Sequence, residues 1–75
     1  METATVLDAR GLKCPMPIVR TAQAIKTVGR GELLEVLATD PGSVADFSAW
    51  SRSTGNELVG NSVQDGVYRF VLRRK

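Results

Sequence analysis

The 75-residue chain contains no histidine and a single cysteine, Cys14. Because histidine is the usual base for cysteine and serine nucleophiles and a common zinc ligand, its absence argues against Cys/His catalysis, Ser/His/Asp catalysis and the usual zinc sites. One cysteine cannot form an internal disulfide, and small secreted domains usually need such cross-links. These absences predict a protein of the reducing cytoplasm that holds no metal and no cofactor.

Long apolar runs and a strong excess of one charge are also missing. No stretch approaches the roughly 20 apolar residues that a membrane-spanning helix needs, and the start METATVLDARG lacks the basic and apolar regions of a signal peptide. The net charge is only +2, and the aromatic residues number four: one Trp, one Tyr and two Phe. We therefore expect no membrane contact and no direct nucleic-acid binding, since a dense basic patch and a stacking platform are both lacking.

What the chain does contain is typical of a small globular protein. Hydrophobic residues make up 43% of the sequence and charged residues 24%. A chain of this length has room for one modest core, because a domain so small buries only about 60% of the surface that its unfolded chain exposes. We expect residues 1–75 to form a single domain that is a monomer and forms transient complexes.

Hydrophobic periodicity predicts a strand over residues 4–9, a helix over 15–28 and a second strand over 32–38. The expected helix carries its apolar face on Ile18, Ala22, Ile25 and Val28, and the GRG at 29–31 supplies a glycine C-terminal cap. A helix that connects two strands favours a parallel crossover between them. In the second strand, Leu34, Val36 and Ala38 are expected to share the core-facing side.

A second helix is expected over residues 44–54, and a hairpin of strands over 57–63 and 67–74. Ser43 and Asp46 have the spacing of a capping box, and Val44, Phe47 and Trp50 mark the apolar side of this helix. Asp65-Gly66 is a tight-turn signal between the two last strands, where Tyr68, Phe70 and Leu72 are assigned to the core.

The order β-α-β-α-β-β predicts an α/β (α+β) two-layer sandwich, in which two helices cover one face of a four-stranded mixed sheet. The opposite sheet face is then open. Leu33, Leu37 and Val71 are expected there, either as a docking or dimer surface or as the scattered apolar residues that any protein surface carries.

Cys14 lies at the predicted start of the first helix, in RGLKCPMPIV. Pro15 suits the first helical position, so Cys14 is expected as the N-cap, at the positive end of the helix dipole, which lowers a thiol pKa. Arg10 and Lys13 are expected to act in the same direction. Pro17 has no N–H, which leaves Met16 as the expected backbone donor to the sulfur.

This reasoning indicates an accessible, nucleophilic thiolate, although a lone cysteine is often only a small buried apolar residue. Without a second cysteine, dithiol exchange within the chain is excluded. A single thiolate can still take the outer sulfur of a persulfide on another protein and pass it to a second partner. That chemistry needs one exposed thiol and two docking events.

The chain resembles the TusA (SirA-like) family of sulfur carrier proteins. The similarity rests on LDARGLKCPMPIV, with its C-P-x-P signature from Cys14 to Pro17, on GELLEVLATDPGSVADF and on TGNELV with DGVYRFVLRRK. It implies the same β-α-β-α-β-β sandwich and a sulfurtransferase-type carrier that is a protein co-substrate rather than a turnover enzyme. It also implies that Cys14 bears the persulfide and that Pro15 and Pro17 shape the helix start.

The resemblance further implies partners. The donor is a cysteine desulfurase or a rhodanese, and the acceptor is a DsrE or TusBCD-like protein in transfer-RNA thiolation, sulfur oxidation or molybdenum cofactor maturation. Many relatives carry a second cysteine and a histidine where this chain has Ser51 and Asn56. The carrier role rests on Cys14 and does not need that second cysteine or that histidine. Their absence argues against redox chemistry in the second helix.

Two further residues have alternative interpretations. Asp40 is either a turn residue, as Asp before Pro often is, or a polar contact for a partner beside Cys14. Lys26 is either part of a solvated helix face or a partner contact. For the whole chain, the alternatives to a sulfur carrier are a small RNA-binding or regulatory module and an interaction domain with an inert cysteine.

Overall fold

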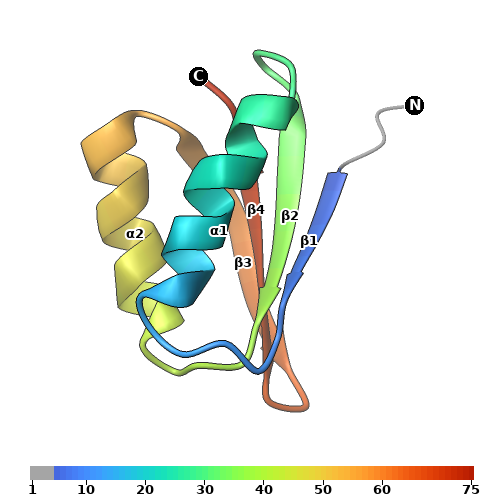
Figure 1. The fold of residues 1–75 in the computed structure, drawn as a ribbon, viewed down its shortest axis with the longest axis vertical. Coiled ribbons are helices and arrows are strands. Elements are labelled where there is room, and N and C mark those ends of the chain that lie inside the picture. Colours follow the sequence, from blue (N-terminus) through green and yellow to red (C-terminus); the bar gives the residue numbers. More distant parts are fainter. Residues whose placement is uncertain (1–4) are drawn as a thin grey trace.

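A computed structural model of the protein describes residues 5–75, which form a two-layer sandwich (Figure 1). The elements in order are β1 (Thr5–Ala9), α1 (Met16–Ala24), the short 3-10 helix η1 (Ile25–Thr27), β2 (Leu33–Ala38), α2 (Ser43–Thr54), β3 (Glu57–Gln64) and β4 (Val67–Arg73). Both helices lie on one face of a sheet with strand order β1-β2-β4-β3. The predicted fold class is confirmed. Ala4, the expected first residue of the first strand, lies outside the described residues.

The strand pairing agrees with the sequence pattern. β1 pairs in parallel with β2, and Ala9 is opposite Ala38 at the end of both strands. β4 is antiparallel to both β2 and β3. The β3–β4 turn has positive φ at Asp65 (53°) and Gly66 (77°), which is the backbone that Asp-Gly favours in a tight hairpin. The predicted parallel pair and the predicted hairpin are therefore both present.

The core lies between the sheet and the two helices. Leu34, Val36 and Ala38 of β2 are fully buried, as predicted, and so are Phe70 and Leu72 of β4. Tyr68 is partly buried against this core. The ring of Phe47 from α2 stacks on Phe70, with centroids 4.3 Å apart and planes 18° from parallel. Such a pair adds about 0.5–1.5 kcal/mol to the stabilisation that burial provides, so it fixes α2 on β4.

The first helix differs from the prediction at both ends and in its buried face. It begins at Met16 and ends at Ala24, after which η1 tightens the backbone. Its core-facing residues are Pro17 and Thr21, with Ile25 and Val28 beyond it, whereas Ile18 and Ala22 are only half-buried. The helix does not end on a glycine cap. Val28 leaves in an extended conformation because its side chain is buried in the core, and the positive φ falls later, at Gly31.

The capping box predicted at the second helix is wrong. Helix α2 has Gly42 as its N-cap and no side-chain cap within the described residues. Ser43 is instead the first helical residue and is 1% exposed, and its Oγ has no hydrogen-bond partner among residues 5–75. Val44, expected on the apolar side, is 44% exposed, so Phe47 and the partly buried Trp50 form that side.

The sheet face opposite the helices carries Leu33, Leu37 and Val71, as expected from alternation, and each is half-buried. An ion pair crosses this face, from Arg69 Nη2 to Glu35 Oε1 at 2.6 Å. A docking role for this face stays a prediction. Between residues 5 and 75, no helix is long and apolar enough to cross a membrane.

Candidate functional site

The candidate site lies where β1 and β2 both end. Parallel neighbouring strands end at the same edge of a sheet, so the segments that follow them run side by side. The Gly11 amide donates to Thr39 Oγ1 at 2.9 Å, and the Cys14 amide donates to Asp40 Oδ2 at 2.8 Å. These two hydrogen bonds, here called the loop latch, hold the segment before α1 against the end of β2.

The start of α1 lies one residue later than the sequence predicted. Pro15 is the N-cap, and its carbonyl accepts the first helical hydrogen bond from the Val19 amide at 3.1 Å. Cys14 therefore precedes the cap instead of forming it. The Met16 amide donates to the Lys13 carbonyl at 2.8 Å, so it is not the donor to the sulfur that we expected. Pro17 lies in the first turn, as predicted.

The thiol of Cys14 is exposed, and its polar partner is a carboxylate. Cys14 Sγ lies 2.7 Å from Oδ2 of Asp46, in the first turn of α2. This hydrogen bond is the main reason that the Cys14 pKa is raised, and burial and the nearby charges of Asp46 and Asp40 act in the same direction. The predicted lowering of the thiol pKa is therefore wrong: the hydrogen bond to the Asp46 carboxylate favours the protonated thiol.

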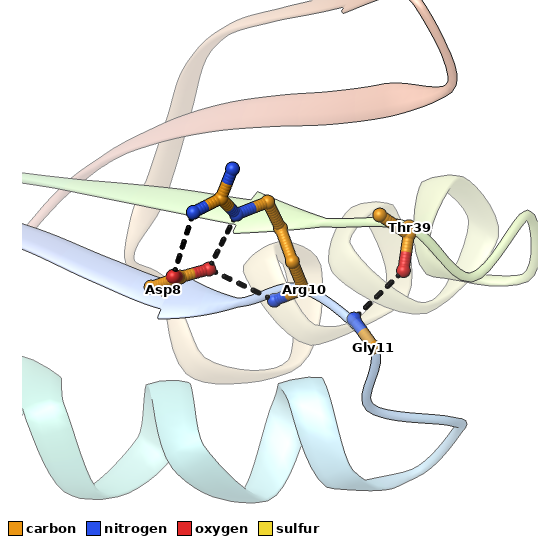
Figure 2. A network of polar contacts seen from close by, with 4 residues as sticks. All are labelled: Asp8, Arg10, Gly11 and Thr39. Carbon is orange, nitrogen blue, oxygen red and sulfur yellow. Dashed lines mark hydrogen bonds and ion pairs between the residues drawn. The ribbon is translucent and has the colours of Figure 1, made fainter.

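Arg10 does not act on the thiol as expected (Figure 2). Its guanidinium is directed away from α1, and it forms two hydrogen bonds to the Asp8 carboxylate, Nε to Oδ1 at 2.9 Å and Nη2 to Oδ2 at 3.0 Å. The Arg10 amide also donates to Asp8 Oδ1 at 3.1 Å. Hydrogen bonds from Arg10 lower the pKa of the Asp8 carboxyl to about 2. The positive charge of Arg10 is thus paired with Asp8 on the open sheet face, not with the thiol of Cys14.

The two lysines of the predicted site are in different places. Lys13 is exposed and lines a hollow together with Cys14. Lys26 is in η1, beyond the end of α1 that is opposite to Cys14 (Figure 1). Lys13 thus shares a hollow with Cys14, although it is not among the groups that shift the Cys14 pKa, and Lys26 lies away from the thiol.

Two hollows open on either side of Cys14. The first has a volume of about 360 Å³ and lies between residues 11–14 and residues 39–41. The second, about 330 Å³, lies between the start of α1 and one side of α2, and we call it the inter-helix hollow. Pro15 and Ile18 line it on one side, and Asp46 and Trp50 on the other. A group that approaches the sulfur can therefore come from either side.

Asp40 and Ser51, two further residues considered in the sequence analysis, form hydrogen bonds with the backbone. Asp40 is both a turn residue and the anchor of Cys14, because Oδ1 accepts from the Gly42 amide at 3.3 Å while Oδ2 holds the Cys14 amide. Ser51 Oγ donates to the Asn56 carbonyl at 2.6 Å and accepts from the Leu58 amide at 3.1 Å. The side chain of Ser51 therefore joins the end of α2 to β3.

Sequence reasoning missed Asp46 and Thr39 as neighbours of the Cys14 segment. Asp46 has the spacing of a helix cap, which made a local role the obvious interpretation. The contact of Thr39 could have been predicted from the strand pattern. Thr39 directly follows β2, and β2 is parallel to β1, the strand that precedes the Cys14 segment. The contact between Asp46 and the thiol depends on how the two helices pack, which periodicity does not encode.

Comparisons with known proteins agree on one family. A family model described as Sulfurtransferase TusA matches residues 5–74. The chain is 44% identical over 68 residues to the "Sulfur carrier protein TusA" of Allochromatium vinosum, covering 91% of this chain and 90% of that protein. It is 49% identical over 74 residues to the "Putative sulfur carrier protein YrkF" of Bacillus subtilis, where it covers 99% of this chain but only 40% of the relative.

A solved structure supports the fold independently. The SirA-like protein from Desulfitobacterium hafniense superposes with a TM-score of 0.80, and the match covers 92% of this chain and 95% of that one. The two sequences are 22% identical. At this level of identity the likeness concerns the arrangement of strands and helices.

Proposed function

The chain belongs to the TusA sulfurtransferase family, and we propose that it is a sulfur carrier in which Cys14 accepts a sulfane sulfur as a persulfide. The observation that carries this proposal is the position of the one thiol of the chain, which is exposed between two hollows. A buried structural cysteine has no such access. The names of the relatives, sulfur carrier proteins, point to the same chemistry.

The proposed reaction is an exchange between two sulfur atoms. The Cys14 sulfur attacks the outer sulfur of a persulfide on the donor, and the donor S–S bond breaks with its electron pair on the inner sulfur. The products are Cys14–S–SH and the thiol of the donor, so one proton moves from Cys14 to the donor and no external oxidant is needed. Onward transfer repeats this step, with an acceptor thiol attacking the outer sulfur on Cys14.

The surroundings of Cys14 suit a thiol that must be reached by two proteins in turn, first the donor and then the acceptor. The loop latch fixes the backbone at Gly11 and Cys14, so the sulfur is held at a defined point of the surface. Hollows on both sides of the sulfur leave room for a partner's sulfur-bearing segment. Lys13 and Asp40 lie at the rim of the first hollow, where a partner can contact them.

For the partners, we propose a cysteine desulfurase or a rhodanese as the donor and a DsrE or TusBCD-like protein as the acceptor, in the cytoplasm. The three pathways open to such a carrier are transfer-RNA thiolation, sulfur oxidation and molybdenum cofactor maturation. The pathways differ in the donor that transfers sulfur to Cys14 and in the acceptor that takes the sulfur from it.

Intact-mass spectrometry tests the proposal. We expect the protein to gain the mass of one sulfur atom when incubated with a cysteine desulfurase and cysteine, or with a persulfidated rhodanese, and to lose it on reduction. Cys14→Ser should gain nothing from either donor. Failure of the wild type to gain sulfur from both donors would overturn the proposed function.

A further inference from the structure

We propose that Asp46 is the proton acceptor and donor of the sulfur exchange: its carboxylate takes the proton of the Cys14 thiol as the sulfur attacks, and returns it to the thiolate that leaves. This inference rests on the proposed carrier function and assigns a catalytic role to a residue of α2. It starts from the 2.7 Å contact between Cys14 Sγ and Asp46 Oδ2.

Other groups near the sulfur are already engaged or lie elsewhere. The chain has no histidine to accept the proton. Both carboxylate oxygens of Asp40 accept backbone amides, Oδ2 from Cys14 and Oδ1 from Gly42. Lys13 lines the first hollow, but among residues 5–75 its side chain makes no contact with the sulfur. Among residues 5–75, Asp46 is thus the carboxylate that contacts the sulfur itself.

The position of Asp46 suits a carboxylate that faces the sulfur from a fixed backbone. It lies in the first turn of α2, where the N-terminal end of the helix dipole favours a negative charge. The Asp46 amide donates to the Gly42 carbonyl at 3.2 Å, so the backbone at this residue is fixed by the helix. Its side chain is therefore aimed at the sulfur from a rigid element.

One of the two approaches to the sulfur passes the same carboxylate. Cys14 and Asp46 both line the inter-helix hollow, whose other walls include Ile18 and Trp50. A persulfide that enters this hollow meets the sulfur and the carboxylate together. Cys14 is exposed at this hollow, so the donor sulfur can reach it from solvent.

The proton balance of the step is then complete. The S–H bond of Cys14 breaks toward Asp46 as the sulfur lone pair forms the new S–S bond, and the donor S–S bond breaks to give a thiolate. The protonated Asp46 gives its proton to that thiolate, which restores the carboxylate. In onward transfer, Asp46 must likewise protonate Cys14 as it leaves, because the contact with the carboxylate makes Cys14 a more basic thiolate.

This role and a merely electrostatic one predict opposite results for Asp46→Asn. Loss of the carboxylate lowers the Cys14 pKa, so reaction with iodoacetamide, which needs only thiolate, becomes faster. If Asp46 only suppressed the thiolate, sulfur transfer would become faster as well. If Asp46 moves the proton, transfer becomes slower, by about 100-fold at the lower end of what general acid–base groups contribute.

The experiment compares the two rates in one set of proteins. Loading is measured by intact mass with glutathione persulfide, which is small enough to reach the sulfur without a protein interface, and alkylation is measured with iodoacetamide across pH. Asp46→Glu keeps a carboxylate and should recover part of the loading rate. Asp65→Asn is the matched control, because it removes the same charge at an exposed turn where Asn tolerates positive φ.

The expected result is faster alkylation and slower loading for Asp46→Asn, with both rates unchanged for Asp65→Asn. Loading by Asp46→Asn at or above the wild-type rate, while the wild type loads normally, would overturn the role of Asp46 and leave the carrier function intact. A wild type that is alkylated but gains no sulfur would instead contradict the proposed function. Thermal unfolding of each variant shows whether the fold is kept.

Discussion

Cys14 Sγ and Asp46 Oδ2 are 2.7 Å apart, although the two residues are 32 positions apart in the sequence. The contact joins the segment before α1 to the first turn of α2, on the same side as the inter-helix hollow. It raises the pKa of the Cys14 thiol, because a thiolate beside a carboxylate is disfavoured. The contact therefore favours the protonated form of the one cysteine of the chain.

The raised pKa of Cys14 predicts how stability depends on pH. A group whose pKa is higher in the folded state stabilises the fold fully below its unfolded pKa, about 8.5 for a thiol. That stabilisation is lost as pH rises through the higher folded pKa. We expect the free energy of unfolding of the wild type, relative to Cys14→Ser, to fall as pH increases beyond this value. Urea unfolding at several pH values measures it, and a constant difference would contradict the contact.

The loop latch is tested by substitution of Asp40. Asp40→Ala removes the acceptor of both the Cys14 and the Gly42 amides, and this loss should cost about 1.5–3 kcal/mol of unfolding free energy. Amide hydrogen exchange at Cys14 should become faster. Asp40→Asn keeps one oxygen acceptor, which can serve the shorter bond to Cys14 while the bond to Gly42 is lost, so exchange at Cys14 should be slower than in Asp40→Ala. Equal exchange at Cys14 in Asp40→Ala and the wild type would show that the latch does not hold the segment.

Ser43 provides a test of the start of α2. If its hydroxyl capped the helix, Ser43→Ala would cost about 0.5–2 kcal/mol. Because the hydroxyl is buried without a hydrogen-bond partner among the described residues, we expect Ser43→Ala to leave stability unchanged or to raise it. Chemical denaturation measures the difference, and a clear loss of stability would restore the capping interpretation.

The Asp8–Arg10 pair predicts a low carboxyl pKa on the open sheet face. The Asp8 pKa, about 2 in the folded protein, should return toward 3.8 in Arg10→Gln. Since a lowered pKa stabilises the fold above the unfolded pKa, the advantage of the wild type over this variant should vanish as pH falls through about 2. Carboxyl-carbon NMR titration measures the pKa, and an unchanged value in Arg10→Gln would exclude the Arg10 side chain as its cause, since the backbone amide is kept.

Most of the fold was predictable because its elements have clear local signals. Alternation identified the buried residues of β2, and Asp65-Gly66 identified the hairpin turn. The errors fall at helix ends, where local signals compete with packing. Pro15 was expected inside α1 but is its N-cap, and Val28 extends into the core instead of ending the helix at a glycine.

The candidate site was only partly predictable. Cys14 stood out as the one cysteine beside two prolines, and its exposure agrees with that reading. The shift of its pKa was predicted in the wrong direction, because a helix start can be inferred from the sequence while the carboxylate that raises the pKa comes from another helix. Local rules assigned Asp46 to its own helix, and only the packing of α1 beside α2 reveals its contact with the thiol.

Transfer of isotopically labelled sulfur through Cys14 tests the central claim most directly. The wild-type protein is loaded by a cysteine desulfurase supplied with labelled cysteine, freed from the donor, and mixed with a DsrE or TusBCD-like acceptor. We expect the label first on Cys14 and then on a cysteine of the acceptor, and we expect no transfer by Cys14→Ser. Label that reaches the acceptor equally well through Cys14→Ser, or that never leaves Cys14, would contradict the claim.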